Sequence, residues 1–126
     1  MSQSNLANYL RYHRKRSGLS QRELARLVGY PNEATVSRHE RLSVVPPLDI
    51  ALRYHAVFRV EISALFPAAH EAACQIIEER LSELERELHN STAKGRSAAI
   101  IARKLEWMWK RSNPEAARLD DESGRA

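Results

Sequence analysis

The fold is decided by residues 19–40, which read LSQRELARLVGYPNEATVSRHE. Ser20 is a favoured helix N-cap residue, and Glu23 three positions later completes a capping box, in which each side chain binds a backbone N–H group of the first turn. Apolar residues then recur at helical spacing, at Leu24, Leu27 and Val28. Gly29 ends this helix, because glycine adopts left-handed backbone angles without a Cβ clash. The pattern predicts a helix over 20–28.

A sharp turn and a second short helix follow. Pro31 fixes its own φ, and Asn32 can cap the next segment. This second helix is predicted over 33–41, with Val36 facing inward and His39 at the edge of that face. Its outward residues are Glu33, Ala34, Thr35, Ser37, Arg38 and Arg41. Two helices joined by a sharp turn, with a polar outer face on the second, are the geometry that presents side chains to the major groove of DNA.

Four stretches keep the order and nearly the spacing of a known family. They are Arg14 with Gly18-Leu19-Ser20-Gln21-x-Glu23-Leu24-Ala25, Gly29 with Thr35-Val36-Ser37-Arg38-x-Glu40-Arg41, Pro46-Pro47-Leu48, and Val60 with Leu65-Phe66. Through them, residues 5–67 resemble the lambda-repressor-like helix-turn-helix domain of the XRE/Cro family of transcriptional regulators. The resemblance implies an all-α fold, with a five-helix, lambda-repressor-like DNA-binding domain over 1–67 whose partner is double-stranded DNA.

Three departures from the family pattern stand out. The turn between Gly29 and Val36 is one residue longer than usual, which could shift the start of the second helix. Leu42 stands where the family usually has glycine after the recognition helix, and Arg59 stands where another glycine commonly follows the fourth helix.

The resemblance also implies roles for individual residues. Arg14 is expected to pair with Glu40, and Gln21 to bind a backbone phosphate. The full set expected to contact DNA is Gln21, Glu33, Ala34, Thr35, Ser37, Arg38 and Arg41. Arg38 is the best candidate for reading a base, because a guanidinium group can bond guanine O6 and N7 together. The alternative is a solvated arginine paired with a neighbouring glutamate.

The helix before this motif is predicted over 5–16, with Ser4 as its N-cap. Its last turn is basic, and Lys15 or Arg16 could meet phosphate there. Net charge is unevenly spread along the chain: it is +5 over 1–67, −4 over 68–90, +5 over 91–113 and −2 over the remainder. A basic N-terminal domain is typical of a polyanion partner.

The C-terminal part is predicted to be a helical hairpin over 68–112. Its acidic first helix, to about residue 89, carries a heptad-like seam of Cys74, Ile77, Leu81, Leu84 and Leu88. This seam needs a partner, which is either another subunit, giving a homodimer, or the next helix or N-terminal domain. Cys74 is expected to be a buried, reduced seam residue. The polar stretch 113–126 is expected to be disordered.

The second hairpin helix, over 96–111, carries a basic face. Its apolar side is formed by Ile101, Leu105, Met108 and Trp109. Trp107 and Trp109 are two positions apart, so they cannot face the same way. The helix can fold back on the acidic one, form a second DNA-contacting surface, or bind a partner.

Several function classes find no support in the sequence. There is no signal peptide pattern, no apolar run of ~20 residues for a membrane span, and a single cysteine. Nucleophile and phosphate-loop motifs are lacking, and the five histidines have no metal-ligand spacing. We therefore expect a cytoplasmic protein that is not an enzyme, with no metal or other cofactor; nothing indicates or excludes a small-molecule effector.

The favoured hypothesis is a homodimeric, sequence-specific DNA-binding regulator. The homodimer would read a palindromic operator with residues 33–41 in the major groove and act as a repressor. The alternative is an interaction module, in which the apolar 42–45 loop and the hairpin bind a protein and DNA binding is weak or lost.

Overall fold

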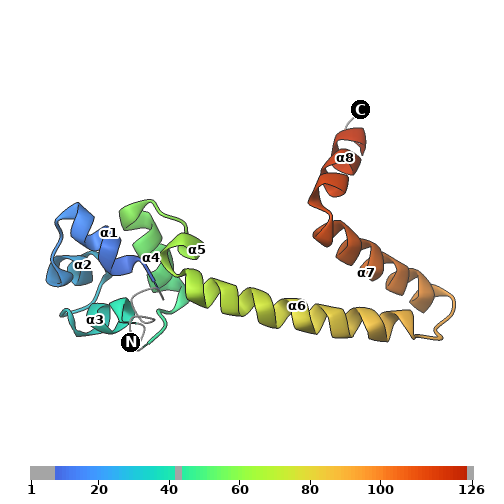
Figure 1. Ribbon diagram of the computed structural model, residues 1–126, viewed down its shortest axis with the longest axis horizontal. Coiled ribbons are helices and arrows are strands. Elements are labelled where there is room, and N and C mark those ends of the chain that lie inside the picture. Colours follow the sequence, from blue (N-terminus) through green and yellow to red (C-terminus); the bar gives the residue numbers. More distant parts are fainter. Residues whose placement is uncertain (1–7, 42–43, 125–126) are drawn as a thin grey trace. The chain divides into compact units, whose positions relative to one another are not determined.

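The computed structural model describes residues 8–41 and 44–124, with side chains as far as Leu119. Every regular element in these residues is a helix, which confirms the predicted all-α fold (Figure 1). The helices are α1 (Leu10–Ser17), α2 (Gln21–Val28), α3 (Ala34–Glu40), α4 (Leu48–Phe58), α5 (Ile62–Leu65), α6 (Pro67–His89), α7 (Arg96–Ser112) and α8 (Pro114–Gly124). None of the described helices is long and apolar enough to cross a membrane.

The chain divides into two compact units, Met1–Cys74 and Gln75–Ala126. From the sequence we expected the first boundary between residues 67 and 68. The N-terminal unit continues instead into the start of α6, because Ala69 packs against the apolar core of that unit.

The core of the N-terminal unit is assembled by α1 to α5. Tyr54 is fully buried, and its ring contacts those of His39 and Phe66. The other buried apolar residues of this cluster are Leu10, Leu24, Ala25, Val28, Val36, Ile50 and Leu65. Helices of seven or eight residues, such as α1, α2 and α3, are unstable alone in water. Their packing on one shared core is therefore what keeps the helix-turn-helix in shape.

The ends of α2 match the prediction. The Ser20 hydroxyl accepts the N–H of Glu23 at 3.0 Å, and the Glu23 carboxylate accepts the N–H of Ser20 at 2.9 Å. The second of these bonds holds the pKa of Glu23 below its ordinary value. At the other end, Gly29 has φ +101°, and the Arg53 guanidinium donates to the carbonyl oxygen of Val28.

The start of α1 differs from the prediction. A helix beginning at residue 5 was expected, whereas α1 begins at Leu10; the expected cap, Ser4, lies outside the described residues. Tyr9 occupies the N-cap position, but its side chain makes no capping bond. The side-chain oxygen of Asn8, one residue earlier, accepts the N–H of Leu10 at 3.0 Å. An asparagine two residues before a helix commonly binds the backbone in this way.

Leu27, which the helical pattern placed toward the core, is 58% exposed. Two leucines of α4, Leu48 and Leu52, are also exposed, at 71% and 48%. On α4 the buried side is formed by Ile50, Ala51 and Tyr54 instead. Arg59, which ends α4 with φ +57°, occupies the left-handed conformation for which the family commonly uses glycine.

In the C-terminal unit, α6 and α7 form an open hairpin (Figure 1). Arg111 of α7 donates to the carboxylate of Glu78 on α6 at 2.7 Å, and this hydrogen bond lowers the pKa of Glu78. Met108 is 7% exposed, but α6 has no buried residue. The hairpin therefore leaves much apolar surface uncovered.

The heptad-like seam of α6 is not buried within one chain. Ile77 and Leu84 are 46% and 41% exposed, whereas Leu81 and Leu88 are half-buried. Cys74 was expected to be buried, and this expectation was wrong: it is exposed, with its sulfur 3.5 Å from Nε2 of His70. One helix turn separates the two, so the contact is local.

The tail expected to be disordered contains a helix. Pro114 begins α8, at the first helical position that proline favours. The Asn113 carbonyl oxygen accepts the N–H of Ala117, and Glu115 lies in the first turn, where an acidic side chain suits the helix dipole. The polar composition of this stretch led to the prediction of disorder, but its alanine, arginine and leucine residues are good helix formers.

Candidate nucleic-acid interface

The helix predicted from the sequence to face DNA is α3. It begins at Ala34, one residue later than predicted, and the Asn32 side-chain oxygen accepts the Ala34 N–H at 3.0 Å. Val36 is completely buried and His39 is 1% exposed, so these two residues fix which side of α3 faces inward. The remaining side of the helix is polar and open to solvent.

A buried ion pair joins α1 to the end of α3. The guanidinium of Arg14 donates to both carboxylate oxygens of Glu40, with Nε at 2.5 Å and Nη2 at 3.2 Å. The remaining nitrogen of Arg14 donates to the carbonyl oxygen of Leu19 at 3.0 Å. The pairing implied by the family resemblance is therefore present, and it connects three consecutive segments of the motif.

Gln21 adds a third donor to the same carboxylate. Its Nε2 lies 3.0 Å from Oε1 of Glu40, and the side chain is half-buried. This bond orients the amide at the first position of α2. Of the first amides of α2 in the described chain, that of Glu23 is taken by Ser20, while those of Gln21 and Arg22 have no protein acceptor. An anion can bind there.

Two further polar contacts hold α3 in place. Nδ2 of Asn8 donates to the carbonyl oxygens of His39 at 2.8 Å and Glu40 at 3.3 Å. On the opposite side, Nδ1 of His39 is 2.8 Å from the hydroxyl of Tyr54 in α4. Burial lowers the pKa of His39 and raises that of Tyr54, so both groups are neutral at pH 7.

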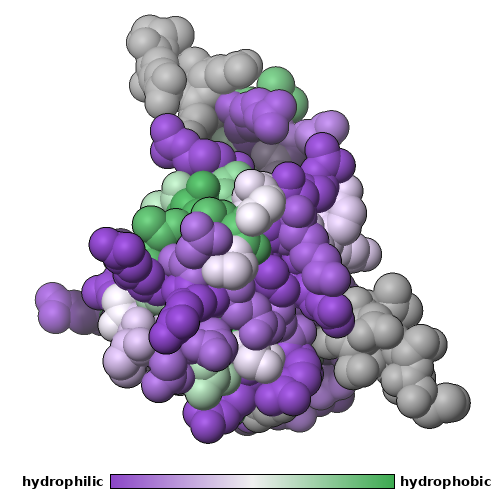
Figure 2. All heavy atoms as spheres, turned by 90° about the vertical axis from the view of Figure 1, so that its left-hand side faces the viewer, coloured by the Kyte–Doolittle hydropathy of each residue, from purple (hydrophilic) through white to green (hydrophobic). Residues whose placement is uncertain are grey.

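An open groove of about 1110 Å³ lies between α1, the start of α2 and α3. It is lined by Asn8, Tyr9, Arg11, Tyr12, Arg14, Lys15, Ser20, Gln21, Arg22, Glu33, Ser37, Glu40 and Arg41. Five of these side chains are basic and two are acidic. The face drawn in Figure 2 is mostly hydrophilic, with an apolar patch among the polar side chains. A groove with excess positive charge attracts a polyanion.

Apart from Gln21 of α2 and Thr35, the sequence-predicted DNA contacts form two strips on α3 and its two caps. Glu33, Ser37 and Arg41 line the groove. Ala34 and Arg38, one turn apart, are exposed outside it, and Thr35 is half-buried. The strips suit different tasks: the groove side can meet a phosphate backbone, while the outer side can reach base edges.

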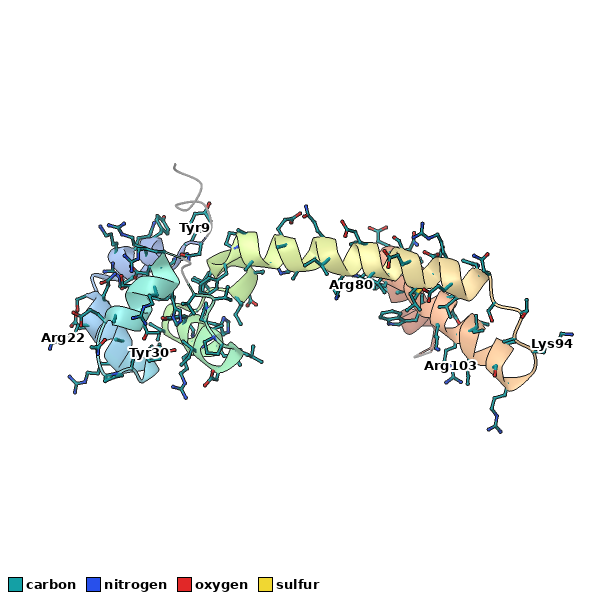
Figure 3. All side chains as sticks on the ribbon, turned by 90° about the horizontal axis from the view of Figure 1, so that it is seen from below. Tyr9, Arg22, Tyr30, Arg80, Lys94 and Arg103 are labelled. Atoms are coloured by element: carbon teal, nitrogen blue, oxygen red, sulfur yellow. The ribbon has the colours of Figure 1, made fainter. Side chains whose placement is uncertain are left out.

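Two basic residues of the groove were not in the predicted set. Arg11 is four residues before Lys15 on the exposed side of α1, and Arg22 projects outward from the start of α2 (Figure 3). The signal for Arg11 was available in its four-residue spacing from Lys15, which places both on one helix face. Leu42 was singled out from the sequence, but it lies outside the described residues.

Residues 5–63 match the family model of a helix-turn-helix domain. No curated protein and no solved structure matches the chain. Over these residues the chain is similar to helix-turn-helix domains, a class with many DNA-binding members. Among the residues that the structure describes, there is no group of three or more potential metal ligands.

Proposed function

We propose that this protein is a sequence-specific transcriptional regulator of the XRE/Cro type, which places α3 in the major groove of DNA. The observation that carries the proposal is the combination of the basic groove with the exposed polar side of α3. The groove would bind one phosphate strand, through Lys15 of α1 and the first amides of α2. Arg38 would then face the base edges.

The proposed regulator is a homodimer that binds a palindromic operator. Two copies of α3 related by a two-fold axis read half-sites ~10 bp apart, or a multiple of that spacing. Repression is the regulatory effect that we propose, because it requires only that the operator be occupied. Dimerisation would use the C-terminal unit, whose seam residues Ile77 and Leu84 are exposed in the single chain.

Selection of bound sequences from a random double-stranded DNA pool tests this proposal on the full-length protein. We expect an inverted repeat to be enriched, with affinity that falls steeply as salt rises. Failure to enrich any sequence at low salt, from protein shown to be folded, would contradict it.

The exposed apolar surface near α4 favours a second candidate function. Val44 and Val45 are 46% and 64% exposed, and Leu48 and Leu52 follow on the open side of α4. A domain retained as a protein-interaction module would use such a surface. Under this alternative, substituting Val45 and Leu48 by serine abolishes partner binding, and no DNA sequence is selected.

A further inference from the structure

Only one side of α6 faces α7. The space between the two helices is lined by Glu78, Leu81, Ser82 and Glu85 from α6 and by Met108, Trp109, Arg111 and Ser112 from α7. Because successive residues turn by about 100°, Ile77 and Leu84 lie roughly 90–110° from the centre of this contact. They are seven residues apart, on one exposed stripe of α6.

A matching exposed stripe runs along α7. Ile100 and Trp107 are also seven residues apart, and they are 43% and 57% exposed. They lie roughly 100–120° from the centre of the contact with α6. Since both helices are right-handed and run in opposite directions, the two stripes fall on the same side of the hairpin. We call this side the open face, defined by Ile77, Leu84, Ile100 and Trp107.

We propose that the open face packs against the open face of a second copy of this chain, so that each α6 lies on the partner's α7 in a four-helix bundle. The inference deepens the proposed function, because it specifies how the proposed homodimer forms. Apolar stripes on two adjacent helices are the arrangement by which four-helix bundles bury a core. Leaving the two isoleucines, the leucine and the tryptophan of the open face exposed to water is less favourable than burying them in such a core.

Charge selects between two possible symmetric arrangements. Within α6 there are six acidic and two basic residues, whereas α7 has five basic and one acidic. A two-fold axis parallel to the helices stacks α6 on the partner's α7, bringing opposite charges together. An axis across the helices stacks α6 on α6, bringing like charges together, which is unfavourable. The parallel axis also brings both α6 N-termini, where the helix-turn-helix domains are attached, to the same end of the bundle.

The hydrogen-bonded ion pair between Arg111 and Glu78 sets the register of the hairpin. Because α6 and α7 are antiparallel, a residue four positions before Arg111 lies at the same height along the hairpin as a residue four positions after Glu78. Trp107 is therefore at the height of Ser82, between Ile77 and Leu84. Since rotation about an axis parallel to the helices preserves these levels, Trp107 would insert between Ile77 and Leu84 of the partner subunit. At the next turn, Lys104 would lie level with Glu83 and Glu87 of the partner subunit.

Charge reversals in the full-length protein test this arrangement by sedimentation equilibrium. One variant carries Glu83→Lys with Glu87→Lys, and the other carries Arg103→Glu with Lys104→Glu. Each should self-associate at least about tenfold more weakly than the wild type, because like charges then oppose each other. An equimolar mixture should regain wild-type affinity as a heterodimer. Arg118→Glu on α8 is the matched control and should change nothing.

Mixing the two variants distinguishes charge pairing between two chains from charge pairing within one chain. In either variant, positions 83 and 87 of α6 carry the same sign of charge as positions 103 and 104 of α7 in the same chain. Charge complementarity within the chain therefore cannot explain recovery on mixing. A chain with all four substitutions should self-associate but should not pair with the wild type. Mixed dimers of that chain with the wild type would show α6 on α6 and overturn the arrangement.

The outcomes also distinguish this inference from the proposed function. A wild-type protein that stays monomeric at about 100 µM would overturn the inference, even if it selects a DNA site. A dimer that behaves as described but selects no DNA would contradict the proposed function and leave the inference standing.

Discussion

Arg14 and Glu40 form a buried ion pair that connects α1 to the end of α3, and both carboxylate oxygens accept from the guanidinium. Their side chains are only 10% and 2% exposed. Because a buried pair often contributes little net stability, its value here lies in fixing the angle of α3. The same carboxylate also orients Gln21, at the position where a phosphate is expected.

Removing one residue of the Arg14–Glu40 pair should lower the stability of the folded protein. Glu40→Ala leaves the Arg14 guanidinium buried without its carboxylate, and we expect a loss of about 3–5 kcal/mol in the free energy of unfolding. Urea denaturation followed by circular dichroism measures this. Glu33→Ala, an exposed acidic residue beside the same helix, is the control and should change stability by less than about 0.5 kcal/mol. A loss below about 1 kcal/mol for Glu40→Ala would show that the pair is solvated.

Stability should decrease on mild acidification because of His39. Burial lowers its pKa in the folded protein, so below about pH 6.5 the unfolded chain binds a proton that the folded chain does not. The stabilisation is complete above that pH and is lost as the pH falls toward the folded-state pKa. The slope is at most about 1.4 kcal/mol per pH unit from this group.

Unfolding free energies between pH 8 and about pH 5 test this expectation for His39. His39→Gln should lower stability at pH 8 but flatten the dependence on pH. His89→Gln, at an exposed site beside Glu85, should keep the wild-type slope. An unchanged slope in His39→Gln would assign the effect to other groups.

Arg59→Gly should stabilise the protein. Arg59 is the only described non-glycine residue with positive φ, a conformation that costs an ordinary residue roughly 1–2 kcal/mol. We expect a gain of about 1 kcal/mol, reduced by the greater freedom of glycine in the unfolded chain. Gly18→Ala is the converse control: φ is +80° with no atom near the added Cβ, so strain alone should destabilise it. If Arg59→Gly is instead less stable than the wild type, the Arg59 side chain contributes more to the free energy of unfolding than the backbone strain costs.

Lys15→Ala should weaken DNA binding without changing its sequence preference. Lys15 lines the groove on α1, where it can neutralise a phosphate but cannot identify a base. Its loss should reduce the slope of log K against log salt by about 1. Fluorescence anisotropy with selected and scrambled DNA measures both quantities. A loss confined to the selected sequence would place Lys15 among the base-reading residues.

Local signals allowed the helix-turn-helix to be predicted from the sequence. The Ser20 and Glu23 capping box and the Gly29 helix end each depend on neighbouring residues, and each appears in the structure. The start of α1 could not be placed, because the Asn8 side chain that bonds the N–H of Leu10 also bonds the backbone of His39, thirty-one residues away. Long-range contacts of this kind leave no periodic signal.

The groove illustrates the same limit. Residues from α1, the start of α2 and α3 converge there, so Arg11 of α1 comes to lie with Arg22 and Arg41 on one groove only after folding. Helical periodicity grouped Ile77 with Leu81 on one seam, but it could not tell which of them faces α7. The answer depends on how the hairpin closes, and Leu81 lines the space beside α7 while Ile77 is exposed.

The most direct test of the central claim is parallel selection of DNA by the wild type, Arg38→Ala and the control Arg26→Ala, an exposed arginine of α2 outside the groove. If the outer side of α3 reads bases, Arg38→Ala loses preference at one base pair of each half-site, by ~1–3 kcal/mol, while Arg26→Ala selects the wild-type sequence. An Arg38→Ala profile that matches the wild type at every position would contradict the account.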